Sequence, residues 1–290
     1  AHHGAAVAIV GDIDFDGYAD MIVGTPGASA GGVSAAGRIV IRSGKTGVLL
    51  REQWSHQPAA NGHYGAALVG LPDLDGDGRS EYAVGAPGES GGVGAVHVYS
   101  GASGVRIWSG SGLPGTKGFG GCLAVVPDCT GDAVVELVVG NGGDHTDQTY
   151  ARIYHANSGL SWKLLNRPQT EEPGVAFGHA VGGIPDVTGD GRGDVVVGAP
   201  LWNGGTVDRG AAWIYDGATG ALVRELATPD PEMFGRFGHA VAGIGDLDGD
   251  GRGEVIVGAP GEDAGMASDG AGRAYVFSGA TGEVIHALIP

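Results

Sequence analysis

The chain has 290 residues, of which 60 are glycine and 33 are acidic, and its formal net charge is −17 at pH 7. This acidity argues against nucleic acid or an anionic membrane surface as a partner, because both are themselves negatively charged. The hydrophobic fraction of 42% is ordinary for a globular protein, and the glycines show no collagen-like period of three. We therefore interpret them as turn residues of a protein built from short β-strands.

The two cysteines, Cys122 and Cys129, lie close together in the sequence. Two buried free thiols and one local disulfide both fit this spacing, so cysteine usage says little about the compartment. No run of 18 apolar residues is present, and no membrane-spanning helix is predicted. No signal peptide is visible, although a cleaved one could precede Ala1.

A short acidic loop recurs five times, beginning at Asp12, Asp73, Asp128, Asp186 and Asp246. The loops follow one another at intervals of roughly 60 residues, and self-similarity at a fixed period predicts a repeat architecture. More than half of the acidic residues of the chain lie in these loops. Metal binding therefore explains the acidity better than a basic partner does.

The first two loops carry acids at positions 1, 3, 5 and 9, counted from their first aspartate, and could offer a backbone carbonyl at position 7. Calcium takes about 6–8 oxygen ligands, and alternate residues of a tightly curled loop can point inward together. The predicted ligands are Asp12, Asp14, Asp16, the Tyr18 carbonyl and Asp20 in the first loop, and Asp73, Asp75, Asp77, the Arg79 carbonyl and Glu81 in the second.

The third and fourth loops depart from this pattern because threonine replaces the acid at position 3. Their predicted ligands are Asp128, Thr130, Asp132, the Val134 carbonyl and Glu136, and Asp186, Thr188, Asp190, the Arg192 carbonyl and Asp194. In the third loop Ala133 also replaces the glycine at position 6, where glycine permits a sharp bend. We expect this site to be the weakest of up to five calcium sites.

The fifth repeat shows the pattern of elements most clearly. A strand is predicted over 237–244, followed by the loop with Asp246, Asp248, Asp250, the Arg252 carbonyl and Glu254. Further strands are predicted over 255–257, 274–277 and 284–288, with a tight turn over 278–282. Four antiparallel strands per repeat are typical of a propeller blade, and no segment shows a sustained helical period.

Phe237-Gly238 precedes the fifth loop and Gly258-Ala259-Pro260 follows it. The same pairing occurs as Phe177-Gly178 with Gly198-Ala199-Pro200, and as Tyr64-Gly65 with Gly85-Ala86-Pro87. With the acidic loop between them, these residues resemble the FG-GAP repeat of integrin α-subunit propellers and their bacterial relatives. The resemblance covers essentially the whole chain, but the third repeat has Gly140-Asn141-Gly142 in place of Gly-Ala-Pro.

The resemblance implies an all-β fold, a β-propeller of five four-stranded antiparallel blades with calcium-binding loops, in one domain. The blades are expected at approximately 1–60, 61–115, 116–173, 174–233 and 234–290. Integrin propellers have seven blades, but five can also close a ring. We expect the last blade to pack on the first in a monomeric ring, with an oligomer or filament as the alternative.

Two smaller patterns have ordinary explanations. Arg192-Gly193-Asp194 is an RGD tripeptide, but it fills positions 7 to 9 of an acidic loop, so an adhesive-ligand role is not expected. His179 and His239 follow Phe-Gly and could bind a transition metal near the propeller axis. We favour packed histidines, because the other repeats have Ala5, Ala66 and Gly121 at this position.

The variable loops implied to lie on the face opposite the acidic loops carry aromatic and charged residues that could contact a ligand. They include Trp54, His56, Asp144, His145, Trp202, Asn203, Asp208, Arg209, Glu232 and Met233. The expected function is non-enzymatic adhesion or recognition of a protein or glycan, outside the cell or at its surface, where free calcium is high. A propeller-based polysaccharide lyase or hydrolase and a structural subunit of a surface layer or filament are the alternatives.

Overall fold

The computed structural model describes residues 2–29, 31–142, 150–168, 174–263 and 271–289. They form five four-stranded sheets, each with its strands in sequence order, as the repeat pattern predicts. The one helical element among them is a short 3₁₀ turn, η1 (Ser90–Gly92). No helix in the described part of the chain is both long and apolar enough to cross a membrane.

The five sheets are as follows. The first contains β1 (Val7–Val10), β2 (Asp20–Thr25), β3 (Arg38–Arg42) and β4 (Leu49–Trp54). The second contains β5 (Ala67–Leu71), β6 (Glu81–Ala86), β7 (Ala95–Tyr99) and β8 (Arg106–Ser111), and the third β9 (Cys122–Val126), β10 (Glu136–Gly140), β11 (Tyr150–His155) and β12 (Ser161–Asn166). The fourth contains β13 (Ala180–Ile184), β14 (Asp194–Ala199), β15 (Ala211–Tyr215) and β16 (Leu222–Leu226), and the fifth β17 (Ala240–Ile244), β18 (Glu254–Ala259), β19 (Arg273–Ser278) and β20 (Val284–Leu288).

Two strand predictions in the fifth repeat need correction. The first strand, β17, begins at Ala240 rather than at Phe237, because Gly238 adopts a φ of 86° and turns the chain just before it. The second strand, β18, extends through Gly258 and Ala259, which pair with Ala274 and Arg273 of β19. The Gly-Ala-Pro segment therefore forms the end of a strand, and only its proline lies beyond it.

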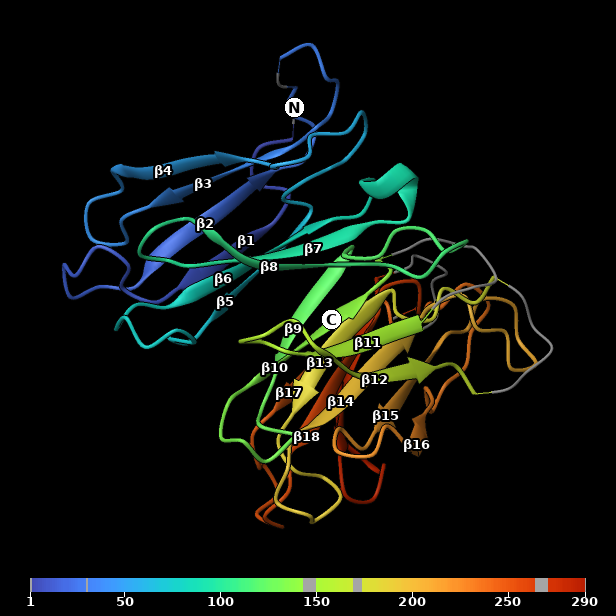
Figure 1. The fold of residues 1–290 in the computed structure, drawn as a ribbon. Helices are drawn as coiled ribbons and strands as arrows, with labels where there is room; N and C mark the ends of the chain where they lie inside the picture. Colours follow the sequence, from blue (N-terminus) through green and yellow to red (C-terminus); the bar gives the residue numbers. More distant parts are fainter. Residues whose placement is uncertain (1, 30, 143–149, 169–173, 264–270, 290) are drawn as a thin grey trace. The chain divides into compact units, whose positions relative to one another are not determined.

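The chain divides into two compact units, which are described separately. Unit 1 comprises Ala1–Leu123 and His155–Leu160, and unit 2 comprises Ala124–Tyr154 and Ser161–Pro290. Figure 1 shows β1 to β4 of unit 1 side by side at the blue end of the colour scale, in the order that the strand pairing gives. Within unit 2, β13 and β17 pack on each other, as β1 and β5 do within unit 1.

Each unit has a core between successive sheets, built around the aromatic residue of the Phe-Gly pair. In unit 1, Tyr64 is fully buried with Ile39 and Ile41 of the first sheet and Tyr82 and Tyr99 of the second. In unit 2, Phe237 occupies the equivalent place among Val196, Ile214, Tyr275 and Phe277. Burial of large aromatic side chains contributes strongly to stability, so this residue joins one repeat to the next.

The glycines of the Gly-Ala-Pro segments allow the backbones of neighbouring repeats to approach closely. A Cβ atom on Gly198 would lie 2.0 Å from the Gly238 carbonyl oxygen, and one on Gly85 would lie 1.9 Å from that of Gly120. In the first, second, fourth and fifth repeats the glycine of the Phe-Gly position donates its N–H to the carbonyl of the first glycine of the Gly-Ala-Pro position, as Gly238 does to Gly258 at 3.1 Å. The two halves of the sequence signature are therefore in direct backbone contact.

A second connection between repeats was not predicted from the sequence. The outermost strand of one sheet places a donor on the turn that joins the last two strands of the next. Arg51 of β4 donates to the Gly101 and Ala102 carbonyls at 3.0 and 2.9 Å. Trp162 of β12 donates to Gly217 at 3.1 Å, and Arg224 of β16 donates to Ala280 and Thr281.

Cys122 and Cys129 do not form the local disulfide that was one of the two alternatives from the sequence. Cys129 is buried, and burial together with the charge of Glu136 raises the pKa of its thiol well above the usual value. Cys122 begins β9 and is partly exposed.

We predict different effects of alanine at two equivalent glycines. Gly198→Ala should lower the free energy of unfolding by about 2 kcal/mol, because its Cβ would overlap the Gly238 carbonyl. Gly258→Ala should change it by less than about 1 kcal/mol, since the nearest atom to its Cβ lies at 3.7 Å. Urea denaturation of both variants tests this, and equal losses would contradict the role assigned to the close approach.

Candidate functional site

Every acidic loop joins the first two strands of its sheet. The acid at position 9 is also the first residue of the second strand: Asp20 of β2, Glu81 of β6, Glu136 of β10, Asp194 of β14 and Glu254 of β18. All five of these side chains are fully buried. The antiparallel pairing places the loop at one end of each sheet, with one carboxylate fixed inside and the others on the exposed loop.

The aspartate at position 1 holds each loop in a curl by accepting backbone hydrogen bonds. In the second loop Asp73 accepts from the N–H groups of Gly76 and Gly78, both at 2.8 Å. Asp246 accepts in the same way from Gly249 and Gly251 at 2.6 and 2.9 Å. The glycines at positions 4 and 6 of these loops have positive φ values of 81–85°, which glycine adopts without steric cost.

In the second and fifth loops all four predicted carboxylates converge. Asp73, Asp75, Asp77 and Glu81 each place an oxygen atom within 4.8 Å of the others, and so do Asp246, Asp248, Asp250 and Glu254. Four like charges at this separation repel one another unless a cation lies between them. An all-oxygen set of this kind suits a hard divalent cation.

The buried acid of these two loops points independently to a positive partner. Oε2 of Glu254 accepts a hydrogen bond from the Leu247 N–H, while Oε1 is buried and has no hydrogen-bond partner. Glu81 is bonded in the same way by Leu74 and also has a buried, unpartnered Oε1. Burial raises the pKa of Glu81 to about 7, and the charges of Asp75 and Asp73 add to this effect. A buried carboxylate oxygen without a partner is costly, and a bound cation would remove that cost.

The first loop brings together three of its four acids, Asp12, Asp14 and Asp20. Desolvation and the charges of Asp20, Asp16 and Asp12 raise the pKa of Asp14. The fourth acid, Asp16, instead accepts a hydrogen bond from the Ser43 hydroxyl at 3.1 Å. Both oxygens of Asp20 accept backbone hydrogen bonds, from Ile13 at 2.9 Å and Gly44 at 3.0 Å.

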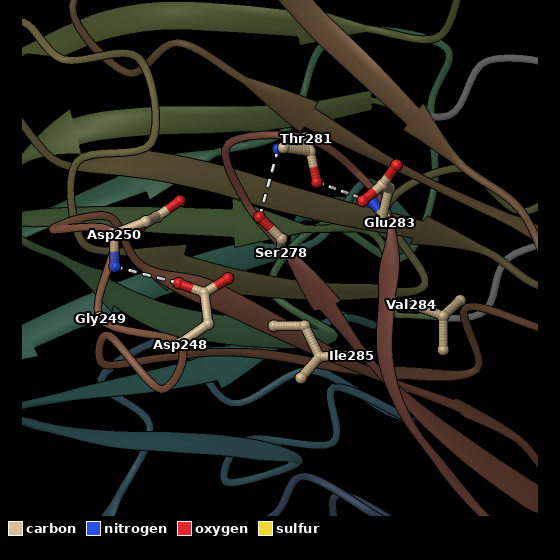
Figure 2. Close-up of a pocket in the computed structure, with 8 residues that line it drawn as sticks. All are labelled: Asp248, Gly249, Asp250, Ser278, Thr281, Glu283, Val284 and Ile285. Carbon is tan, nitrogen blue, oxygen red and sulfur yellow. Dashed lines mark hydrogen bonds between the residues drawn. The ribbon is translucent and has the colours of Figure 1, made fainter.

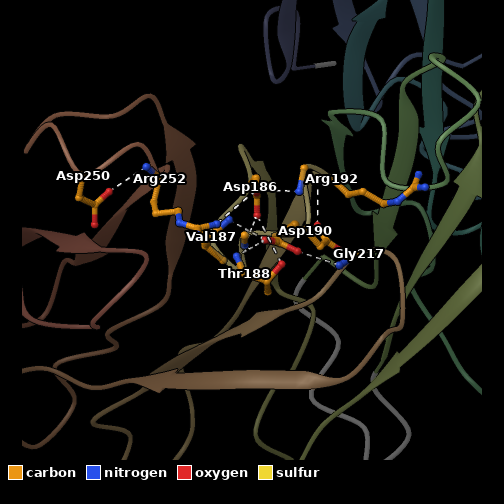
Figure 3. Close-up of polar contacts among 11 residues, drawn as sticks. Asp186, Val187, Thr188, Asp190, Arg192, Gly217, Asp250 and Arg252 are labelled. Atoms are coloured by element: carbon orange, nitrogen blue, oxygen red, sulfur yellow. Dashed lines mark hydrogen bonds and ion pairs between the residues drawn. The ribbon is translucent and has the colours of Figure 1, made fainter.

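The fourth loop keeps the curl but does not bring its three acids together. Among the described residues, Asp186, Asp190 and Asp194 do not form a group within 4.8 Å. Asp194 accepts hydrogen bonds from the N–H groups of Val187 at 2.8 Å and Gly217 at 3.0 Å. Burial nonetheless raises the pKa of its carboxyl to about 6. Figure 3 shows this cluster, in which the Arg252 guanidinium approaches Asp186.

The third loop has its own internal hydrogen bonds. Glu136 accepts from the Cys129 N–H at 2.7 Å and from the Thr130 hydroxyl at 3.0 Å. Thr130 therefore bonds to the buried acid where the first, second and fifth loops carry a carboxylate. Ala133 at position 6 adopts a φ of 65°, a conformation that costs a non-glycine residue about 1–2 kcal/mol.

The residue at position 7 is held by the carboxylate at position 5 in every loop. The N–H groups of Tyr18, Arg79, Val134, Arg192 and Arg252 donate to Asp16, Asp77, Asp132, Asp190 and Asp250, at 2.8 to 3.0 Å. This contact fixes the backbone beside the converging acids. Ligation by the five carbonyl oxygens stays a prediction.

A pocket of about 460 Å³ lies beside the fifth loop (Figure 2). Asp248 and Asp250 line it on one side, and the turn residues Ser278 and Thr281 with Glu283 line it on the other. This turn has the sequence Ser-Gly-Ala-Thr-Gly, and similar turns occur at 43–47 and 100–104. Their position next to the acidic loops was not predicted, although their recurrence in the repeat was a usable signal.

The RGD tripeptide behaves as its place in an acidic loop predicts. Asp194 of the tripeptide is fully buried, so its carboxylate is not displayed for a receptor. The rings of His179 and His239 lie with their centroids 4.7 Å apart and tilted by 53°, in contact with each other. Asp144 and His145, named above for the opposite face, lie outside the described residues.

A sequence profile of the FG-GAP repeat matches residues 3–41, 64–99, 177–215 and 237–277. These segments make up more than half of the chain, so the chain belongs to the FG-GAP repeat family. They cover the first, second, fourth and fifth repeats, and the degraded third repeat lies outside them. FG-GAP repeats are propeller blades, and the five sheets are accordingly five blades of an all-β, integrin-like propeller.

Curated relatives include several integrin α chains. Integrin alpha-IIb of Homo sapiens is 36% identical over 107 residues, which cover 34% of this chain and 10% of that protein. Integrin alpha-V of Gallus gallus is 29% identical over 211 residues, covering 67% and 20%. Integrin alpha-3 of Cricetulus griseus is 31% identical over 186 residues, covering 60% and 17%. The chain thus spans about a tenth to a fifth of the length of these relatives. The extracellular or cell-surface location predicted from the sequence agrees with that of the integrin α chains.

We predict that the acidic loops contribute unequally to cation binding. Asp248→Ala should remove one bound calcium ion, because it deletes one of four converged carboxylates. Thr130→Ala should leave the number of bound ions unchanged, since the Thr130 hydroxyl already bonds to Glu136. Calcium counted by atomic absorption after dialysis distinguishes the two, and equal losses would show that this ranking of the loops is wrong.

Proposed function

We propose that the chain is a calcium-binding, extracellular recognition propeller without catalytic activity. The observation that carries this proposal is the convergence of four carboxylates in the second and fifth loops around a buried, unpartnered glutamate oxygen. Carboxylate and carbonyl oxygens favour calcium or magnesium over softer metals. A site dominated by carboxylates that needs few waters suits calcium better, because magnesium usually keeps several of its waters.

A bound calcium ion would neutralise the acids and link the two strands that each loop connects. Glu81 and Glu254 would contribute their free Oε1 atoms, and the acids at positions 1, 3 and 5 would contribute from the exposed side. Because β6 and β18 begin at these glutamates, the ion would fix the end of each blade. The proposed role of calcium is therefore to stiffen the scaffold that carries the recognition loops.

The recognition surface is proposed at the opposite end of the blades. The first strand of each sheet ends at the acidic loop and therefore begins at the opposite end of the sheet. The second strand begins at the acidic loop and ends at that opposite end. The segment 227–239 before β17 and the segment 200–210 after β14 therefore lie away from the acidic loops in unit 2. Loops on a rigid scaffold commonly carry binding residues.

An exposed apolar cluster marks this end of unit 2. Val207, Met233 and Phe234 are 47%, 59% and 52% exposed, and the Phe234 N–H donates to the Val207 carbonyl at 2.8 Å. Phe234 has a φ of 61°, an uncommon conformation for an aromatic residue that often marks a functional position. In contrast, Trp202 is buried and packs edge-on against Trp213. We infer that the ligand, a protein or glycan, contacts the cluster of Val207, Met233 and Phe234.

We predict that calcium stabilises the fold. Addition of excess EDTA should lower the melting temperature by about 5 °C or more, since a ligand at 100 times its Kd stabilises by about 2.7 kcal/mol per site. Differential scanning fluorimetry with calcium and with EDTA measures the shift, and magnesium serves as the control cation. An unchanged melting curve in EDTA would refute the proposal.

We also predict that one aromatic residue dominates recognition. Phe234→Ser should weaken binding to a printed panel of extracellular proteins and glycans at least tenfold, as truncation of an exposed aromatic anchor does. Leu247→Ser is the matched control, because Leu247 is 58% exposed but lies in the fifth acidic loop. Binding that is lost equally in both variants, or cleavage of a glycan on the panel, would contradict the proposed function.

A further inference from the structure

Three of the five acidic loops have arginine at position 7: Arg79, Arg192 and Arg252. Each side chain extends to the preceding acidic loop and lies against the residue at position 4 of that loop. The arginine therefore contributes its backbone to its own loop and its charge to the neighbouring one.

The contact is most direct between the fifth and fourth loops. Nη1 of Arg252 lies 3.3 Å from Oδ2 of Asp186, and Figure 3 shows the side chain reaching Asp186 from the fifth loop. A Cβ atom on Gly189, at position 4, would lie 2.2 Å from Nη2. Both side chains of the ion pair are only partly exposed, at 31% and 25%. The guanidinium thus lies against the backbone at position 4 of the loop, next to the acid that organises the curl.

Arg192 of the fourth loop lies against the equivalent glycine of the third loop. A Cβ atom on Gly131, at position 4 of the third loop, would lie 2.0 Å from Nη1 of Arg192. In Figure 3 the Arg192 side chain extends away from Asp186.

Arg79 contacts the first loop in a different way. Position 4 is Phe15, and the Arg79 guanidinium lies over the Phe15 ring, 4.3 Å from its centroid. The aromatic ring takes the place of the glycine that lets Arg192 and Arg252 approach a loop. Within the described residues, no ion pair joins Arg79 to an acid of the first loop.

Among the residues that the structure describes, no arginine side chain from a neighbouring loop lies against position 4 of the second or the fifth loop. A Cβ atom on Gly76 or Gly249 would have no neighbour within 4 Å. These are the two loops in which four acids converge around a buried, unpartnered glutamate oxygen. The two loops in which an arginine lies against the position-4 glycine are the two that have lost the acid at position 3, to Thr130 and Thr188. In the second to fifth loops the number of carboxylates and the presence of a guanidinium at that glycine therefore change together, whereas the first loop has four acids and an arginine over Phe15.

We propose that Arg192 and Arg252 act as internal counter-cations of the third and fourth loops, which do not require the divalent cation that the first, second and fifth loops bind. An arginine stays protonated at all physiological pH values and carries one fixed charge. It would satisfy a loop with three acids in part and would also oppose the entry of a divalent ion. The first half of this proposal is the role of the arginines, and it needs no metal ion. The second half, that the third and fourth loops do not require a divalent cation, rests on the cation binding proposed above.

A double-mutant cycle in EDTA tests the counter-cation directly. The variants are Arg252→Met, Asp186→Asn and both together, and Arg79→Met, Asp12→Asn and both together form the matched control. The Arg252–Asp186 cycle should show a coupling that changes the unfolding equilibrium constant about two- to fivefold, as expected for a partly exposed ion pair. The control cycle should be additive, because Arg79 lies on Phe15. Additive behaviour of the Arg252–Asp186 pair would overturn the proposal.

Isothermal titration with calcium tests the second half of the proposal, that the third and fourth loops do not require a divalent cation. The chain should bind three ions, and Arg252→Met should raise the affinity of the fourth loop and add a further ion. Five equivalent sites in the unmodified chain would overturn the proposal. Binding of no calcium at all would refute the proposed function and with it the second half, while the cycle in EDTA would still decide the role of the arginines.

Discussion

The structure depends on the repulsion among acids that the fold itself brings together. Each blade begins its second strand with a buried carboxylate and places further acids above it on a curled loop. Backbone hydrogen bonds to the aspartate at position 1 hold the curl, but they neutralise little of the charge. Acids that converge in this way favour a positive partner, and the loops differ in how many acids they bring together.

The second constraint is the close approach of backbones between repeats. Phe-Gly and Gly-Ala-Pro are separated in the sequence by an acidic loop, yet Gly238 contacts both Gly198 and Gly258. The buried aromatic residue beside this contact holds two sheets together within each unit. In each sheet the acidic loop lies at one end, and in unit 2 the exposed cluster of Val207, Met233 and Phe234 lies at the end opposite its acidic loops. Stiffening at one end can thus support recognition at the other.

Much of this arrangement was predictable from the sequence because it repeats. The recurrence of Phe-Gly, the acidic loop and Gly-Ala-Pro gave the all-β blades and the five loops. The start of β17 was placed three residues early, since alternation in 237–239 does not reveal the positive φ of Gly238. The arginine contacts were missed because they join one repeat to its neighbour, as Arg252 joins Asp186. Nor does the sequence distinguish buried Trp202 from exposed Phe234, because burial depends on the loops packed around them.

The most direct measurement is a crystal structure of the chain grown with calcium, with anomalous scattering used to locate the ions. The account predicts an ion in the second and fifth loops, with Oε1 of Glu81 and Oε1 of Glu254 within about 2.3–2.6 Å of it. Loops that keep all four carboxylates converged with no ion between them, at millimolar calcium, would contradict it.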